Sequence, residues 1–411
     1  MTSFDPKRVR SDIPLLKRKV HGQSITYLDS AASAVTPRAV IESMSRYYET
    51  RHANVHRGVY VTAEEATATY EGARAAVGRF IGAAHPPEEI IFTKNTTEAF
   101  NLLAQSWGTA NLSSGDVVVL TEMEHHANLV PWYQLRDRIG FEIRFIAVND
   151  QFRLDLEGLE RTLDGAKLVS LTAMSNVLGT INPVSHIARA AHSAGALVAV
   201  DGAQIVAHES VDVVAEGIDF MAFGAHKMLG PTGIGALYAK REHLEGMGPF
   251  LGGGGMIADV SLDGFTPARD ISRFEAGTPP IAESAGFHAA VRYLDQLGIS
   301  DIADHERRLT QYALDRLTLE FGSSVRVIGP LDTIDRGGVI SLDVIGVHAH
   351  DVAQVLDQFG VCVRPGHHCA KPLMRRFGLQ ATARASFGPY SLRGDVDVLI
   401  DALGHAVKLF A

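Results

Sequence analysis

The sequence contains little cysteine, little tryptophan and no long apolar run. Only two cysteines and two tryptophans occur in 411 residues. So few cysteines exclude a disulfide framework and agree with a reducing compartment. Without a run long enough to span a bilayer, and with both charge signs but no apolar core in residues 1–19, the sequence predicts neither a membrane span nor a signal peptide. We expect a cytoplasmic protein that does not contact membranes.

An excess of positive charge is also missing. The net charge is −9 and the isoelectric point is near 6.0, which argues against binding to nucleic acid or to an acidic membrane. With 46% hydrophobic and 21% charged residues, the composition is that of an ordinary globular protein. The length allows two or three domains.

Strand and helix patterns alternate through the first two thirds of the chain. Short apolar strands are expected at 89–92, 116–120, 142–148, 167–173, 196–200, 220–223 and 236–239. Helices are expected between them, at 99–107, 154–163 and 185–194 among others. This alternation predicts a mostly parallel sheet with helices on both faces. In such sheets ligands bind beyond the carboxyl ends of the strands, and five polar residues lie there: Thr96, His125, Asn176, Asp201 and Lys227.

Lys227 stands out within the segment 219–235. It follows an apolar strand and precedes a glycine- and proline-rich turn, where desolvation would lower its pKa and free its amine to form a Schiff base. For this one position taken alone, a lysine that merely extends its amine to solvent is the favoured interpretation. The four polar residues at the other strand ends favour the functional interpretation.

Two further strand ends leave alternatives open. Thr96 and Thr97 lie at a strand-to-helix turn, where they could bind a phosphate, cap the helix, or do both. The adjacent His125 and His126 suggest a metal. However, neighbouring side chains of an extended segment point to opposite sides and no third ligand follows at a suitable spacing, so we expect no metal. A single histidine there could stack on a planar ligand.

After residue 281 the pattern changes to long helices and then to a smaller α/β unit. We therefore expect an N-terminal segment at 1–22 that packs with the small domain, a large domain at 23–290 and a small domain at 291–411. Cys362 alternates with valines and is expected in the core. Cys369 follows two histidines and has Arg364 and Lys371 nearby, and cationic neighbours favour the reactive thiolate. A metal-binding or incidental cysteine remains an alternative.

Several short motifs carry a resemblance to a known family. They are DSAA at 29–32, HRG at 56–58, TTEAFNL at 96–102, MEHHANLVPW at 123–132, SNVLGT at 175–180, DGAQ at 201–204, HKMLGPTGIG at 226–235, RFEAGTP at 273–279 and RPGHHCA at 364–370. In this order and spacing the chain resembles the fold-type I pyridoxal 5′-phosphate enzymes of the class V aminotransferase group, and most closely the SufS-type (group II) cysteine desulfurases. The resemblance implies a large domain with a mostly parallel seven-stranded sheet and a smaller C-terminal α/β domain.

The resemblance also implies roles toward the cofactor. Lys227 would hold pyridoxal 5′-phosphate as a Schiff base, Asp201 would pair with the ring nitrogen, and His125 would stack on the ring and move protons. Gln204 would contact the phenolic oxygen. The phosphate and its surroundings would involve Thr96, Thr97, Asn176, Gly224 and His226, with Gly277 and Thr278 reaching it from the partner subunit of an obligate homodimer with shared sites.

On the substrate side, the resemblance implies that Arg384 grips the carboxylate of L-cysteine, helped by Asn176, Arg364 and His56. Cys369 would take the sulfur as a persulfide, L-alanine would leave, and an acceptor of SufE or SufU type would carry the sulfur to iron–sulfur cluster assembly. The alternatives are a selenocysteine lyase, an aminotransferase or kynureninase-like enzyme that does not need Cys369, and a non-enzymatic sulfur-carrier scaffold.

Two positions depart from the family pattern. Gly224 stands where a serine is usual, which predicts weaker cofactor retention. The segment 387–391, FGPYS, differs from the usual tyrosine–asparagine pattern. That difference could alter the substrate-side wall or the docking of the sulfur carrier.

Overall fold

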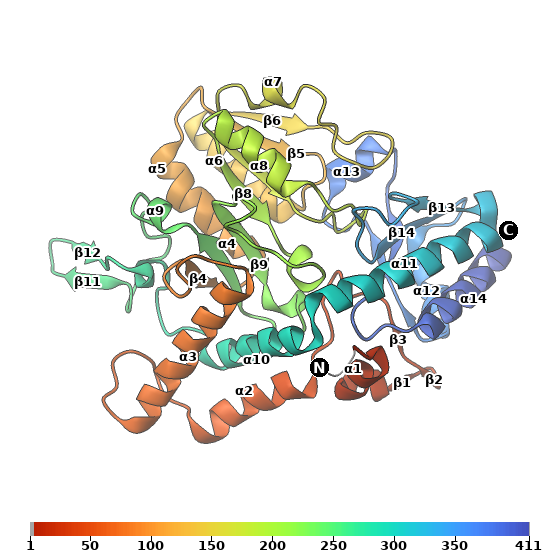
Figure 1. Cartoon of the computed structure of the whole chain (residues 1–411), viewed down its shortest axis with the longest axis horizontal. Helices are drawn as coiled ribbons and strands as arrows, with labels where there is room; N and C mark the ends of the chain where they lie inside the picture. The colour runs from red at the N-terminus through yellow and green to blue at the C-terminus, as the bar shows by residue number, and fades with distance from the viewer. Residues whose placement is uncertain (1–3, 411) are drawn as a thin grey trace.

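A seven-stranded sheet forms the centre of the computed structural model, which describes residues 4–410 (Figure 1). In spatial order its strands are β4 (Ile90–Thr93), β10 (Gly235–Ala239), β9 (Phe220–Gly224), β8 (Leu197–Asp201), β7 (Ala166–Thr172), β5 (Val117–Thr121) and β6 (Glu142–Ile146). β10 is antiparallel to both of its neighbours, and the other pairs are parallel. The predicted mostly parallel seven-stranded sheet is therefore confirmed.

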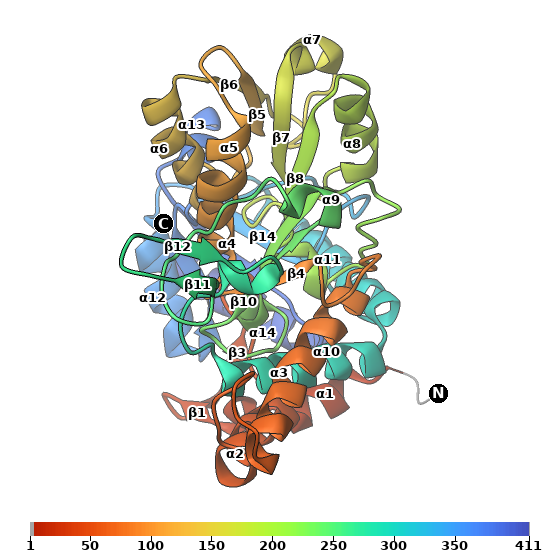
Figure 2. The ribbon, with the colours of Figure 1, turned by 90° about the vertical axis from the view of Figure 1, so that its left-hand side faces the viewer.

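Apolar residues on both faces explain why this sheet is covered by helices on both sides, as Figure 2 shows. Every residue of β5 is buried, which is typical of a parallel strand between two helical layers. Because successive side chains of a strand point to opposite faces, Val118 packs into the core that contains Trp132, and Val119 packs into the core that contains Ile187. These two partners belong to α6 (Val130–Ile139) and α8 (Val184–Ser193).

Long helices connect this sheet to the rest of the chain. α2 (Arg38–Thr50), α3 (Val61–Phe80) and α10 (Ile281–Leu297) pack together, and α11 (Ile299–Phe321) follows α10 directly. The turn between them uses Gly298 at φ +82°, a conformation that L side chains rarely adopt. In Figure 1, α11 leads away from the large sheet toward the C-terminal part of the chain.

The C-terminal part has its own four-stranded antiparallel sheet, in the order β13 (Val325–Ile328), β14 (Val339–Val344), β17 (Thr382–Ser386) and β16 (Arg364–Gly366). α12 (Ala349–Gln358) and α14 (Arg393–Phe410) pack beside it around a separate apolar core. The N-terminal segment contacts this part, since Arg10 Nη1 lies 2.9 Å from Asp395 Oδ2. The domain limits expected at residues 22 and 290 stay a prediction.

The remaining elements are short. They are α1 (Pro6–Asp12), β1 (Lys19–Val20), β2 (Gln23–Ser24), β3 (Thr26–Tyr27), α4 (Thr96–Leu103), α5 (Thr109–Asn111), α7 (Leu159–Leu163), α9 (Arg241–Leu244), β11 (Ile257–Val260), β12 (Phe265–Pro267), β15 (Val361–Cys362) and α13 (Lys371–Arg376). β3 pairs with β15, and β11 with β12. Within residues 4–410, no helix combines the length and the apolar character that a membrane crossing requires.

Two predicted helices differ from the observed ones. The helix expected at 154–163 is only α7, because the chain before it forms a turn in which Leu154 pairs with Val148. The helix expected at 99–107 begins earlier, at Thr96, and continues through a π-helical turn at Ala104–Gly108. The early start is important for the site, because it makes Thr96 and Thr97 the first two residues of α4.

Candidate active site

A pocket of about 540 Å³ lies at the carboxyl ends of the parallel strands. Its walls come from the segments after β4, β5, β7, β8 and β9, from β16 and β17, and from the loop at residues 367–371, which we call the Cys369 loop. Parallel strands bring these sequence-distant segments to one edge of the sheet. The expected site residues that line the pocket are Thr96, Thr97, His125, Asn176, Asp201, Gln204, His226, Lys227, Arg364, Cys369 and Arg384.

Lys227 ends a 3₁₀ turn, Ala225–Lys227, that directly follows β9. Burial lowers the pKa of its amine to about 8, although the charge of Asp201 acts in the opposite direction. Part of the side chain still faces the pocket. A sizeable fraction of neutral, nucleophilic amine is therefore present near neutral pH, as Schiff-base formation requires.

Burial shifts the pKa values of His125 and Asp201 in opposite directions. Burial, followed by the charge of Lys227, lowers the pKa of His125 to about 3. Its Nδ1 accepts a hydrogen bond from the Ala127 N–H over 3.0 Å, so the proton of the neutral ring is on Nε2. Asp201 is buried, and burial raises its pKa. It accepts a hydrogen bond from the Ala203 N–H over 2.9 Å.

The N-terminus of α4 forms the anion-binding end of the pocket. Asn95 caps this helix by accepting a hydrogen bond from the Glu98 N–H over 2.9 Å. Because the cap is Asn95, the threonine hydroxyls of residues 96 and 97 are not needed for capping. The first N–H groups of a helix have no partner within the helix, and they favour an anion together with the helix dipole.

Gly224 and His226 lie beside that helix end. A Cβ placed on Gly224 would be 3.3 Å from Thr96 Oγ1, so the glycine leaves room for the threonine hydroxyl. Burial lowers the pKa of His226 to about 4, and its Nδ1 is 3.3 Å from Ser33 Oγ. A neutral imidazole can still donate one hydrogen bond to a phosphate oxygen.

These groups together suit pyridoxal 5′-phosphate. N–H and hydroxyl donors stand at one end, the Asp201 carboxylate can meet a ring nitrogen, the His125 ring offers a flat surface, and Lys227 can meet an aldehyde. Gln204 Nε2 donates to the Ala31 carbonyl over 2.8 Å. Its Oε1 is buried without a hydrogen-bond partner among the described residues, as expected of a side chain that meets a ligand.

Arg384 and Arg364 form the cationic wall of the pocket. Arg384 is only 2% exposed, and burial lowers the pKa of its guanidinium to about 10. It donates from Nη1 to the Asn176 carbonyl over 2.9 Å, and its Nε is buried without a partner in residues 4–410. A carboxylate is the natural acceptor for such a donor.

Asp29 joins these two arginines, a role that the sequence did not predict. Its carboxylate accepts from Arg364 Nη2 over 3.0 Å and from Arg384 Nη2 over 3.3 Å. The only sequence signal was the position of Asp29 in the DSAA motif. Its two partners lie 335 and 355 positions further along the chain.

The two cysteines differ in environment. Cys369 is exposed and lines the pocket that contains Lys227. Cys362, expected in the core, is instead half-buried in β15, because that strand belongs to a two-stranded edge pair rather than to a sheet covered on both faces. Burial raises the pKa of Cys362, which makes it the less reactive of the two thiols.

Some expected site residues lie outside this pocket. His56 Nε2 is 2.9 Å from Glu71 Oε1, and Gly277 donates its N–H to the Gly254 carbonyl over 2.7 Å. Neither these residues nor Thr278 lines the pocket around Lys227. The segment at 125–126 is also not extended as expected, since His126 begins a 3₁₀ turn. Although this segment is not extended, the ring centroids of His125 and His126 still lie 6.2 Å apart.

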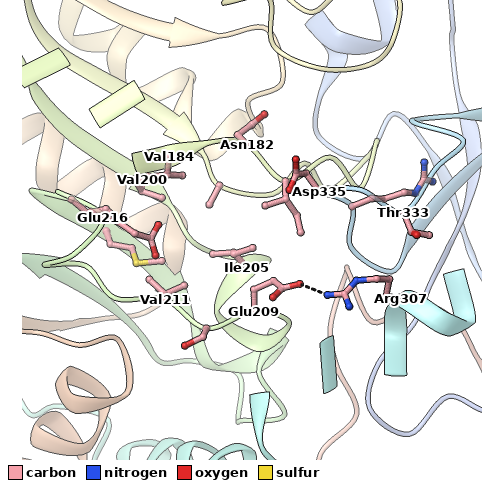
Figure 3. A pocket seen from close by; sticks show the side chains of 16 residues that line it. Asn182, Val184, Val200, Ile205, Glu209, Val211, Glu216, Arg307, Thr333 and Asp335 are labelled. Atoms are coloured by element: carbon pink, nitrogen blue, oxygen red, sulfur yellow. Dashed lines mark ion pairs between the residues drawn. The ribbon is translucent and has the colours of Figure 1, made fainter. Parts of the chain in front are cut away.

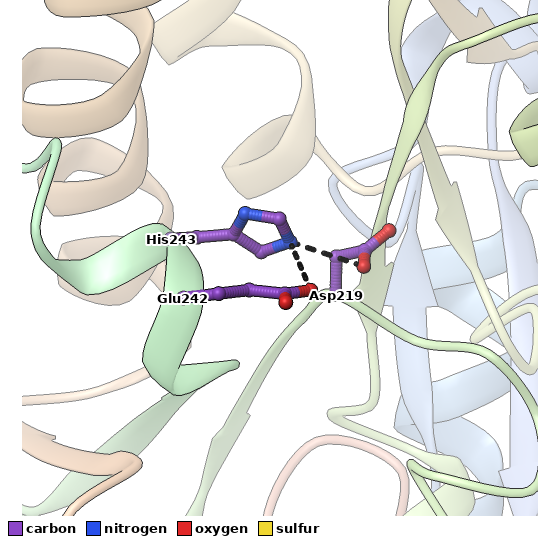
Figure 4. Close-up of side chains that lie close together, drawn as sticks. All are labelled: Asp219, Glu242 and His243. Carbon is purple, nitrogen blue, oxygen red and sulfur yellow. Dashed lines mark hydrogen bonds and ion pairs between the residues drawn. The ribbon is translucent and has the colours of Figure 1, made fainter.

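Two other places were candidates for a site. One is the pocket of Figure 3, which has a volume of about 300 Å³ and is not lined by Lys227. In it, Arg307 Nη2 lies 4.0 Å from Glu209 Oε1. Figure 4 shows Asp219, Glu242 and His243, whose potential ligand atoms are within 4.8 Å of one another. The Lys240 ammonium already lies 2.8 Å from Asp219 Oδ1, and a cation in that position disfavours a metal ion.

The fold and this constellation define a pyridoxal-phosphate enzyme of fold type I. The sequence profile described as "Aminotransferase class-V" matches residues 26–399, and the chain belongs to this family. A cysteine desulfurase from Haloferax volcanii is 47% identical over 420 residues, covering 99% of this chain and 98% of the relative.

Solved structures agree with this assignment. The apo cysteine desulfurase from Thermococcus onnurineus superposes with a TM-score of 0.93 at 41% identity, covering 100% of this chain and 99% of its own. The S-sulfonic acid form of the cysteine desulfurase CsdA from Escherichia coli superposes with a TM-score of 0.91 at 37% identity, covering 100% of both chains. These comparisons confirm the predicted family, fold and cofactor class, and the prediction of a pyridoxal-phosphate-dependent cysteine desulfurase.

Proposed function

We propose that this chain converts L-cysteine to L-alanine and holds the released sulfur as a persulfide on Cys369. The observation that carries the proposal is that Lys227, Arg384 and Cys369 line the same pocket, although Lys227 follows the large sheet and the other two belong to the C-terminal part of the chain. An amine, a carboxylate-binding cation and an exposed thiol are the groups that this reaction requires.

In this proposal Lys227 holds the cofactor covalently, and Asp201, Gln204, His226 and the N-terminus of α4 hold its ring nitrogen, phenolic oxygen and phosphate. Thr96, Thr97 and His125 complete the set. Pyridoxal 5′-phosphate, when bound, supplies an aldehyde for the substrate amine and an electron-accepting ring. The lowered pKa of Lys227 supports its second task, which is to take and return the proton on the α-carbon of the substrate.

The substrate is oriented through its carboxylate. The unpartnered Nε of Arg384 is the donor that supports this role, with Asn176 and Arg364 beside it. A fixed carboxylate and a fixed amine leave the side chain of L-cysteine to extend along the remaining wall, where Cys369 lies. Holding the reacting sulfur near the thiol in this way converts a bimolecular step into an effectively unimolecular one.

The transfer of sulfur to Cys369 needs no reactant other than L-cysteine and the Cys369 thiol. The Cys369 thiolate attacks the substrate sulfur, an S–S bond forms, and the bond between that sulfur and the β-carbon breaks. The β-carbon keeps the electron pair and takes a proton, which produces the methyl group of L-alanine. His125, whose neutral ring carries its proton on Nε2, is a suitable donor for the accompanying proton transfer and can take that proton back afterwards.

The proposal extends to the partners. Because Cys369 is exposed, a separate acceptor protein of SufE or SufU type can reach the persulfide and carry its sulfur to iron–sulfur cluster assembly in the cytoplasm. We also propose a homodimer with shared sites. It is supported by the position of Gly277 and Thr278 outside the pocket of their own chain, and by the exposed apolar residues Leu262 and Phe265 near them in the chain.

The test incubates the purified holoenzyme with L-cysteine and a reductant, and measures alanine and sulfide. We expect both products from the wild type, and their loss in Cys369→Ser and in Lys227→Ala. Cys362→Ser is the matched thiol control and should retain activity. A Cys369→Ser variant with full turnover would contradict the role of the thiol. Alanine formed from L-selenocysteine but not from L-cysteine would instead identify a selenocysteine lyase.

A further inference from the structure

The backbone around Cys369 has an unusual conformation. His368 and Cys369 have φ angles of 50° and 55°, in the left-handed region that residues other than glycine rarely adopt. Two consecutive residues of this kind persist only where surrounding contacts hold them. The contacts that hold the Cys369 loop therefore decide where the thiol lies.

His126 makes two hydrogen bonds to the loop, one at Cys369 and one at Lys371. Its backbone N–H donates to the Cys369 carbonyl over 2.7 Å, and its side-chain Nε2 accepts from the Lys371 N–H over 3.1 Å. Its ring also lies beside the His367 ring, with 5.7 Å between centroids. One residue of the large-sheet part thus contacts the loop at residues 367, 369 and 371.

Other contacts complete the support of the loop but act at different points. Asn176 Nδ2 donates to the His368 carbonyl over 2.8 Å, and His368 Nε2 is 2.9 Å from Thr382 Oγ1. Within the loop, the Cys369 N–H donates to His367 Nδ1 over 3.1 Å. Within residues 4–410, only the bond from Lys371 to His126 relies on an imidazole nitrogen that reaches the loop from another segment.

We propose that His126 is a positioning residue, whose neutral imidazole holds the Cys369 loop in the conformation that presents the thiol to the pocket. The proposal rests on the proposed function in one respect, namely that Cys369 accepts the sulfur. His125, the preceding residue, faces the pocket, so the histidine pair divides its tasks between the pocket and the loop.

Protonation of His126 removes the acceptor, because an imidazolium has no free lone pair. The titratable groups beside it are His125, His367, Cys369 and Lys371. Burial, together with the charges of His367 and Lys371, lowers the pKa of His126 below 6.5. The bond is therefore present at neutral pH and is lost as the pH falls through that lowered value.

The test compares two variants of the holoenzyme. His126→Phe keeps a ring but has no acceptor, whereas His126→Gln keeps an acceptor at a similar reach and does not titrate. Hydrogen exchange of the Lys371 amide, measured by NMR or by mass spectrometry with electron-transfer fragmentation, reports the bond directly. We expect about fivefold to tenfold faster exchange in His126→Phe and little change in His126→Gln, as for the loss of one hydrogen bond.

Two further measurements separate positioning from general structural damage. The kcat for alanine formation should fall about fivefold to tenfold in His126→Phe with the KM for L-cysteine unchanged, and His126→Gln should restore it. Corrected for intrinsic exchange rates, the Lys371 amide of the wild type should lose protection as the pH falls from neutral through the lowered pKa of His126, while that of His126→Gln should not. The exchange of amides in β5 serves as the reference for an intact fold.

Unchanged Lys371 exchange in His126→Phe would overturn the proposal, and so would a His126→Gln variant that is as impaired as His126→Phe. The exchange experiment does not depend on turnover. A wild type that makes no alanine would therefore refute the proposed function, while the exchange data would still decide whether His126 holds the loop.

Discussion

Asp29 Oδ1 accepts a hydrogen bond from Arg384 Nη2 over 3.3 Å, and the same carboxylate binds Arg364 over 3.0 Å. The pocket wall therefore already contains one carboxylate between its two guanidinium groups. Two positive charges and one negative charge leave a single positive charge for the carboxylate of an amino-acid substrate. Asp29 thus matches the charge of the wall to a substrate with one carboxylate.

Replacing this carboxylate should make the pocket bind anions more tightly. A carboxylate about 5 Å from a bound anion raises the free energy of that anion by up to roughly 3 kcal/mol. Because asparagine keeps one of the two acceptor oxygens, Asp29→Asn loses only the hydrogen bonds of the other oxygen, at roughly 1 kcal/mol each. We expect Asp29→Asn to lower the inhibition constant of malonate about tenfold, and to raise its dependence on salt concentration. An inhibition constant that is unchanged or higher would show that orientation of the arginines outweighs charge.

The lowered pKa of Lys227 predicts how the apoenzyme regains its cofactor. Only the neutral amine forms a Schiff base, so the rate of reconstitution with pyridoxal 5′-phosphate should rise about tenfold for each pH unit below the pKa, and level off above about 8. The absorbance of the bound cofactor measures this rate. A midpoint near 10.5, the ordinary lysine value, would contradict the prediction.

The Asp201→Asn variant is a control for which the direction of the shift in the reconstitution midpoint can be predicted. Because the charge of Asp201 raises the pKa of Lys227, its removal should shift the midpoint of reconstitution to lower pH. A shift to higher pH would mean that the two groups do not interact as their positions suggest.

The buried pair of Arg74 and Glu275 should contribute strongly to stability. Arg74 donates from Nη1 to Glu275 Oε1 over 2.6 Å and from Nη2 to Oε2 over 2.8 Å, and Arg74 is 2% exposed. Arg74→Met leaves the carboxylate without its main partner, so we expect the free energy of unfolding to fall by about 3–5 kcal/mol. Chemical denaturation of the holoenzyme measures it.

An exposed pair is the matched control. Arg326 Nη2 lies 2.8 Å from Asp343 Oδ2 near the surface, and Arg326→Ala should change the free energy of unfolding by less than about 1 kcal/mol. Arg74→Met combined with Glu275→Gln should recover part of the loss, because no charge is left unpaired. Equal effects of the buried and exposed replacements would refute this explanation.

Replacing Gly224 by serine should increase the retention of the cofactor. Its φ of −129° accepts a serine without backbone strain, and the new Cβ would be 3.3 Å from Thr96 Oγ1, which requires only a small shift of that hydroxyl. A hydroxyl that donates a hydrogen bond to the phosphate contributes about 1.5–3 kcal/mol, so Gly224→Ser should lose cofactor at least about tenfold more slowly during dialysis. Gly224→Ala, which adds the Cβ alone, should not.

Local sequence patterns were sufficient for most of the site. The apolar runs that precede Asp201 and Lys227, and the turns that follow them, identify strand ends without any knowledge of distant contacts, because a buried strand needs only a short apolar segment. Parallel strands then place such ends together, which is why Thr96, His125, Asp201 and Lys227 were expected in one pocket and line it.

Local patterns were insufficient where two interpretations used the same residues. Capping of α4 by Asn95 rather than by a threonine depends on where the helix begins, and that boundary lies at Thr96 rather than at the expected residue 99. The short α7 in place of the expected helix at 154–163 has a similar origin, since Leu154 pairs with Val148 instead of continuing a helix.

By itself, the sequence determined the family, the mostly parallel large sheet, and the chemical groups of the pocket, because these depend on short motifs and on hydrophobic periodicity. The tertiary structure alone decided the partners of those groups. Asp29 meets Arg384 across 355 positions, and His126 meets Lys371 across 245. Hydrogen bonds of this kind form only when two parts of the chain that are distant in sequence pack against each other, and no local pattern encodes the distance between them.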